Sequence, residues 1–172
     1  RGHGIATVIA TGNDGYTASI SSPACISTAV SVSSTTKTDG VSSFSNVSSF
    51  MNLFAPGSDI SSSIVGNAYG TMGGTSMATP QVAGAWAVMK QAKPSASVTE
   101  VLNSLINTGL PIPDTRSGGT VTKPRIRLNN AVLDLTNTPS FTVTPSVTGF
   151  GTISPASQQS VTLNTTLTFT VS

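Results

Sequence analysis

A single serine stands at the point where a glycine pair gives way to a run of small residues. Gly73 and Gly74 precede Thr75 and Ser76, and helix-forming residues, many of them small, follow as far as Pro94. This pattern predicts a glycine turn that leads into a buried helix, with Thr75 or Ser76 at its cap. Backbone N–H groups at a helix start have no partner inside the helix and carry partial positive charge. A serine there has its hydroxyl beside donors that could hold an oxyanion, which is the chemistry of acyl transfer.

The segment Gly74–Gly84 reads Gly-Thr-Ser-Met-Ala-Thr-Pro-Gln-Val-Ala-Gly. It resembles the nucleophile segment of the subtilisin family of serine endopeptidases at every position except Gln81, where that family usually has a histidine that is not the catalytic one. The resemblance implies that Ser76 is the nucleophile and that Gly74 contacts the substrate. The alternative is a small-residue helix packed tightly on a sheet, with Ser76 as an ordinary cap.

A second segment of the same kind follows the apolar run Ile5–Ala10. Ala10-Thr11-Gly12-Asn13 resembles the family's Ala-(Ala/Ser)-Gly-Asn segment, which implies that the Asn13 side chain donates to the oxyanion. The resemblance also implies that Ala10, Thr11 and Gly12 form one wall of the pocket for the substrate residue before the cut bond. Ser21 then lies near the base of that pocket, or else belongs to a plain strand connection. Asn13 alone could equally be a turn residue that tolerates positive φ.

The only histidine, His3, lies in a Gly-His-Gly turn, and we interpret it as a turn residue and not as a catalytic base. In subtilisins the triad runs Asp, His, Ser along the chain, so the resemblance implies that the Asp and His lie upstream. We therefore expect a fragment of a protease that is inactive alone. The alternatives are a degenerate, non-catalytic protease domain that serves as a binding or scaffold module, and an esterase. An esterase would need an Asp and a His after the serine, and no histidine follows Ser76.

The elements around these segments fit an α/β domain. The apolar run Ile5–Ala10 is typical of a strand buried on both faces. Ser97-Val98-Thr99-Glu100 is a capping box, and apolar residues at helical spacing follow it as far as Gly109. Ala29–Ser33 is expected to form a strand and Val41–Asn46 a surface strand pair. Leu53–Gly57 is expected to form a buried strand, and Pro111–Gly119 a loop. Pro124–Ala131 loosely resembles the family's final strand and helix.

The predicted fold is the C-terminal half of a three-layer, subtilisin-like α/β domain with a mostly parallel sheet, followed by a short β-rich tail. The first domain is expected at residues 1–136. Residues 137–172 would be a linker and the start of a truncated β-sandwich-like module, since Phe141–Thr144 and Val161–Val171 alternate in the manner of strands.

Composition limits the partners that the 172 residues could have. Charged residues make up 8% of the chain, against roughly 25% in an average soluble protein. The eight Lys and Arg are scattered, so we expect no nucleic-acid partner, and no apolar run is long enough to span a membrane. Cys25 is expected to be a small buried hydrophobe and no metal cluster is visible. The family resemblance implies secretion, protein or peptide substrates and a monomer without a required cofactor, although structural calcium is possible in the intact protein.

Overall fold

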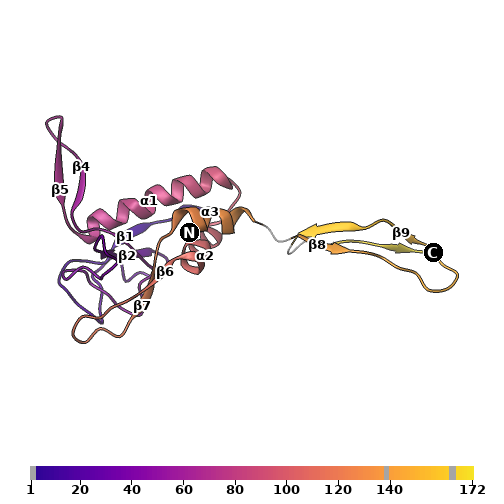
Figure 1. Ribbon diagram of the computed structural model, residues 1–172, viewed down its shortest axis with the longest axis horizontal. Coiled ribbons are helices and arrows are strands. Elements are labelled where there is room, and N and C mark those ends of the chain that lie inside the picture. The colour runs from indigo at the N-terminus through magenta and orange to yellow at the C-terminus, as the bar shows by residue number, and fades with distance from the viewer. Residues whose placement is uncertain (1–2, 138–139, 163–165) are drawn as a thin grey trace. The chain divides into compact units, whose positions relative to one another are not determined.

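The computed structural model describes residues 3–137, 140–162 and 166–172 (Figure 1). The chain divides into two compact units, Arg1–Thr136 and Asn137–Ser172. The first unit contains the candidate site.

A five-stranded sheet forms the centre of the first unit. Its strand order is β1 (Val8–Ala10), β2 (Val30–Thr35), β3 (Leu53–Pro56), β7 (Thr122–Arg125) and β6 (Leu110–Pro113). The first four strands run parallel and β6 pairs antiparallel with β7. The predicted α/β fold with a mostly parallel sheet is therefore confirmed.

Three helices pack on one face of this sheet, and they are α1 (Thr75–Ala92), α2 (Val98–Thr108) and α3 (Leu128–Thr136). Buried apolar side chains of β2 and β3 form one core with all three helices. Phe54 points to the opposite face, where it packs with Val47, Met51 and Ile112. The capping box that begins α2 is confirmed, because the Ser97 side chain accepts from the Glu100 N–H and the Glu100 carboxylate accepts from the Ser97 N–H.

A β-hairpin precedes α1 directly, and Figure 1 shows it standing away from the sheet. Its strands β4 (Ile60–Ile64) and β5 (Ala68–Met72) pair antiparallel over their whole length. Gly66 and Asn67 both have positive φ at the turn, a conformation that these two residue types adopt at low cost. This hairpin was not among the predicted elements, although a Gly-Asn pair between two short runs is a known hairpin signal.

Two of the predicted strands differ in the structure. Ile5–Ala10 is not a strand buried on both faces, because only Val8–Ala10 is extended and its residues are half-buried. The reason is position, since β1 is the edge strand of the sheet. Val41–Asn46 is not a surface strand pair. It makes one bridge to β2 and then turns inward, so that Ser42, Ser45 and Asn46 are buried.

Two smaller predictions are also wrong. Residues 111–113 were expected in a loop but belong to β6, where the two prolines are tolerated because β6 is an edge strand. Cys25 was expected to be buried and is exposed. Its neighbour Ala24 takes the inward position instead and is fully buried.

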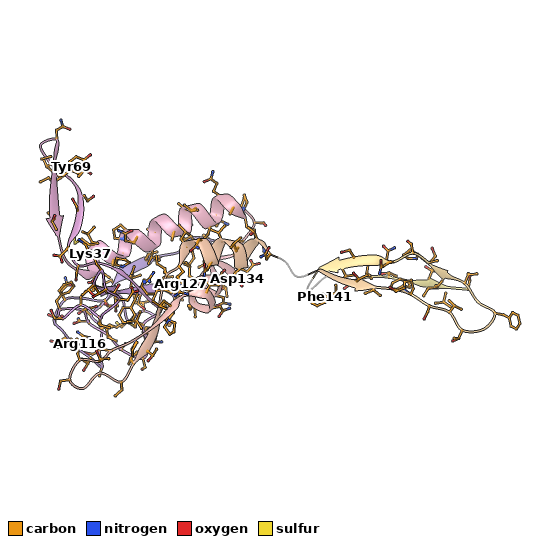
Figure 2. The ribbon with its side chains drawn as sticks, in the orientation of Figure 1. Lys37, Tyr69, Arg116, Arg127, Asp134 and Phe141 are labelled. Atoms are coloured by element: carbon orange, nitrogen blue, oxygen red, sulfur yellow. The ribbon has the colours of Figure 1, made fainter. Side chains whose placement is uncertain are left out.

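The second unit consists of two small antiparallel ribbons. Strand β8 (Ser140–Val143) pairs with β10 (Gln159–Thr162), and β9 (Ile153–Ser154) pairs with β11 (Thr170–Val171). Its apolar side chains are largely exposed, among them Phe141 on β8 (Figure 2). The β-rich tail is thus confirmed, whereas a β-sandwich module stays a prediction. Residues 163–165 of the expected strand Val161–Val171 lie outside the described residues.

Candidate active site

Ser76 is an exposed residue in the first turn of α1, next to the hairpin. The helix does not begin as predicted, because its N-cap is Gly74 and neither Thr75 nor Ser76 acts as the cap. Thr75 is the first helical residue, and its side chain is committed elsewhere. The Ser76 N–H belongs to the first turn, where a helix offers N–H groups no partner of its own. Ser76 therefore has an accessible hydroxyl and a backbone donor at the positive end of an 18-residue helix.

The Asn13 side chain reaches this helix start from the loop after β1. Its Oδ1 accepts hydrogen bonds from the Thr75 backbone N–H and from the Thr75 hydroxyl, both at 2.9 Å. The same hydroxyl oxygen accepts from the Gly12 N–H at 3.2 Å. These contacts hold the oxygen end of the Asn13 amide against α1. The Nδ2 end is thereby left as a donor that can face a ligand.

Both candidate oxyanion donors border the same small space beside Gly74. A methyl group built on Gly74 would lie 3.5 Å from Asn13 Nδ2 and 3.7 Å from the Ser76 backbone nitrogen. A side chain at this position would therefore compete with any group held by the two donors. The backbone of Gly74 is held in place, because its N–H donates to the Gly57 carbonyl at 2.8 Å. The glycine thus keeps open the space that an oxyanion would need.

The residues predicted to form a substrate pocket lie at the carboxyl end of β1. Ala10 ends that strand and is half-buried, whereas Thr11 is fully buried and its hydroxyl bonds to Ser33 and to the Asn46 carbonyl. The Thr11 side chain is therefore unable to line a pocket. Gly12 has a φ of +102°, and a methyl group there would come within 2.5 Å of both Ser21 Oγ and Asn46 Nδ2. Gly12 and Ser21 are thus packed around the buried amide of Asn46.

A cavity of about 370 Å³ opens on the other side of Ser76. It lies between the hairpin and the first turns of α1, and none of the five predicted substrate-binding residues lines it. Apolar groups dominate its walls, together with the Ser76 hydroxyl, and the lining includes Ile60, Ile64, Met72, Met77 and Pro80. Tyr69 lies on the same hairpin (Figure 2) and is 83% exposed.

Two features that carry titratable groups lie away from the start of α1 in the sequence. His3 is in an exposed turn before β1, at the start of the described chain. A buried ion pair lies in the loop between β6 and β7, where the Arg116 guanidinium donates to the fully buried Asp114 carboxylate at 2.7 and 2.8 Å. Burial alone would raise the pKa of Asp114, but the hydrogen bonds and charge of Arg116 hold this pKa below its usual value.

The described residues contain no group of three or more His, Cys, Asp or Glu side chains that could hold a metal ion. Within the same ranges, no helix combines the length and the apolar character that crossing a membrane requires.

Comparison with known proteins places these features in a family. The family model described as "Subtilase family" matches residues 1–151, a range that passes the boundary between the two compact units. "Subtilisin BL" of Lederbergia lenta is 39% identical over 116 residues, which cover 67% of this chain and 43% of that protein. "Extracellular serine proteinase" of Thermus sp. (strain Rt41A) is 42% identical over 105 residues, 60% of this chain and 26% of that protein. The chain thus spans less than half the length of these relatives.

Solved structures agree with the sequence comparison. A cold adapted subtilisin-like serine proteinase superimposes with a TM-score of 0.63 and 38% identity, over 69% of this chain and 43% of that one. The prenylagaramide maturation protease PagA has a TM-score of 0.69 at 24% identity, over 78% of this chain and 51% of that one, and this likeness concerns the fold alone. The family-model match spans the start of α1, the loop after β1 and the mostly parallel sheet, and this chain belongs to the subtilase family.

Proposed function

We propose that this chain supplies the nucleophile and the oxyanion donors of a secreted serine endopeptidase. The observation that carries the proposal is the arrangement at Gly74, where Asn13 Nδ2 and the Ser76 N–H border one small space next to an exposed serine hydroxyl. Both donors are fixed before any substrate arrives, one by the helix and one by Thr75. Preorganised donors of this kind favour the charge that develops in acyl transfer.

The reaction would proceed through an acyl-enzyme. Ser76 Oγ attacks the substrate carbonyl carbon and its proton passes to a histidine, while the carbonyl π electrons move onto the oxygen that Asn13 and the Ser76 N–H hold. When the tetrahedral intermediate collapses, the histidine gives this proton to the leaving amine. Water then repeats the sequence on the ester, which releases the acid and restores Ser76.

The histidine and the aspartate of this mechanism would come from polypeptide outside these 172 residues. His3 is the only histidine in the sequence, and the chain covers 43% of a subtilisin that it resembles. We infer that the 172 residues alone are inactive and that activity needs the remaining part of a subtilase domain. Substrates would be proteins or peptides, hydrolysed by a monomer with no nucleic-acid partner. Ala10, Gly12 and Ser21 would contact the residue before the cut bond, and Thr11 only through its main chain.

The mechanism itself needs no cofactor. The intact protein could still bind structural calcium through carbonyl as well as carboxylate oxygens, and we propose no site for it. Two of the matched relatives carry the word "extracellular" in their names, which supports secretion. The rival function is a non-catalytic binding or scaffold module, and the observation in its favour is the lack of a second histidine in this sequence.

The test compares three proteins on casein: the intact protein, its Ser76→Ala variant and the 172-residue chain. We expect sustained hydrolysis by the intact protein only. An intact protein with no activity would support the scaffold function. Sustained turnover by the 172 residues, abolished by Ser76→Ala, would show that a base within this chain is sufficient.

A further inference from the structure

The fully buried side chain of Asn46 is the centre of the hydrogen bonds around the loop that carries Asn13. Asn46 Oδ1 accepts from the backbone N–H groups of Asp14 and Tyr16, at 2.9 and 3.1 Å. Its Nδ2 donates to the Asp14 carboxylate at 2.9 Å, to Ser21 Oγ at 3.1 Å and to the Thr11 carbonyl at 3.2 Å. The amide thus binds the chain on both sides of Asn13.

The backbone of Asn46 also binds this loop, because its N–H donates to the Gly12 carbonyl at 3.0 Å. The close approach of Gly12 to Asn46 Nδ2 leaves no room for a side chain, as described above. Residues 12–14 therefore wrap around one buried amide. From this geometry, and resting on the function proposed above, we propose that Asn46 is a positioning residue that aims Asn13 at the oxyanion.

Burial of an amide side chain destabilises the folded state unless its polar atoms make hydrogen bonds. Each side-chain hydrogen bond of Asn46 described above goes to residues between Thr11 and Ser21. Removal of this side chain would therefore loosen the Asn13 loop more than any helix or strand. Misplacement of a catalytic group by about 1 Å is enough to cost roughly 10²-fold in rate.

The ion pair of Asp114 and Arg116 holds Asn46 in place from the other side. Arg116 Nη1 donates to three carbonyls in the segment just before Asn46, at distances of 2.7 to 3.3 Å, and these belong to Ser42, Ser43 and Ser45. The rest of the guanidinium is fixed by the Asp114 carboxylate. Figure 2 shows Arg116 among the loops at the side of the sheet remote from the hairpin tip. The chain of contacts thus runs from Arg116 through the segment 42–46 to Asn13.

The chain offers a matched control in Asn52. Its Oδ1 accepts from the backbone N–H and the hydroxyl of Ser31, at 2.9 and 3.1 Å, and the Asn52 backbone N–H donates to the Ser31 hydroxyl oxygen at 3.0 Å. Ser31 is near the amino end of β2, whereas Asn13 follows the carboxyl end of β1, so Asn52 makes these hydrogen bonds toward the other end of the parallel strands. Asn46→Ala and Asn52→Ala both remove a buried or half-buried amide with its hydrogen bonds.

We expect different kinetics from these two variants of the intact protein on a small peptide substrate. Asn46→Ala should lower kcat by about tenfold to 100-fold with little change in KM, somewhat less than the loss of Asn13 itself. Asn52→Ala should lower the melting temperature but leave kcat within about twofold. In the 172-residue chain, Asn46→Ala should speed amide hydrogen exchange at Asp14 and Tyr16, a readout that needs no activity.

A rescue pair covers the case in which Asn46→Ala does not fold. Asn46→Asp places a second carboxylate against that of Asp14, and adding Asp14→Asn restores a donor facing an acceptor. The single change should lower kcat, and the double change should raise kcat again by at least tenfold. No recovery, unchanged exchange at Asp14 and Tyr16, or equal effects of Asn46→Ala and Asn52→Ala on kcat would overturn the positioning role. Retained activity in Ser76→Ala would instead overturn the proposed function.

Discussion

Replacing Asn13 tests whether its amide donates to the transition state or only shapes a turn. Asn13→Leu removes the Nδ2 donor, but it also removes the acceptor that Thr75 uses twice. Asn13→Asp keeps that acceptor and replaces only the donor end with a negatively charged oxygen. The two variants therefore separate the catalytic contact from the structural one.

The size of the effect follows from the two donors that border the space beside Gly74. Loss of one charge-assisted hydrogen bond of about 1.5–3 kcal/mol corresponds to a fall in kcat of about ten- to 150-fold. Loss of one oxyanion donor in subtilisin itself lowers kcat by roughly 10²–10³, a value carried over from the family and not worked out from this geometry. KM should change little, because the charge exists only in the transition state.

The free energy of unfolding should also distinguish the two variants, with Asn13→Leu the less stable of the two. Asn13→Leu leaves the N–H and hydroxyl of the buried Thr75 without their acceptor, at a cost of about 1–3 kcal/mol. Asn13→Asp should keep most of that stability and yet lower kcat at least as much, since its charge repels an oxyanion. The assay is steady-state hydrolysis of a chromogenic peptide by the intact protein, with melting curves for each variant. A folded Asn13→Asp variant with near-wild-type kcat would refute the oxyanion role.

Four further predictions concern an ion pair, the second compact unit and a helix cap. Arg116→Leu should destabilise the fold by about 3–5 kcal/mol, because it leaves the Asp114 carboxylate buried without its partner, and denaturant unfolding measures this. The pKa of Asp114 is lowered in the folded state. The free energy of unfolding that this ion pair contributes should therefore be fully present above about pH 4, and it should be lost as the pH falls through the folded pKa. The Arg116→Leu variant should not show this loss of stability in acid. Removal of residues 137–172 should leave the kcat of the intact protein unchanged, and a large loss would show that the tail belongs to the catalytic domain. Ser97→Ala should cost about 1 kcal/mol by breaking the capping box, whereas no change in melting temperature would contradict its role in α2.

The local signals in the sequence were sufficient for much of the fold. The capping box at Ser97 and the apolar run at Leu53 each depend on near neighbours, and both elements form where they were predicted. The strand at Ile5 was wrong in its burial, because exposure depends on which strand lies at the edge of the sheet. Sheet order is a long-range property that no short window of sequence contains.

The same limit applies to the candidate site. The types and spacing of Ser76 and Asn13 pointed to acyl transfer, but the contact of Asn13 with Thr75 joins residues 62 positions apart. The residues around Asn46 predict a surface strand pair, since nothing in that segment indicates that the chain turns inward and encloses the Asn46 amide. Its partners become visible only when the loop after β1 is placed beside it.

Covalent labelling of Ser76 is the most direct test of the central claim. A fluorophosphonate ester transfers its phosphonyl group to an activated serine and releases fluoride, and peptide mass spectrometry then identifies the modified residue. In the intact protein we expect the adduct on Ser76, in step with loss of peptide hydrolysis, and we expect none in the Ser76→Ala variant. An active protein that loses its activity with the adduct on a different residue, or that keeps Ser76 unmodified throughout, would contradict the assignment of Ser76 as the nucleophile.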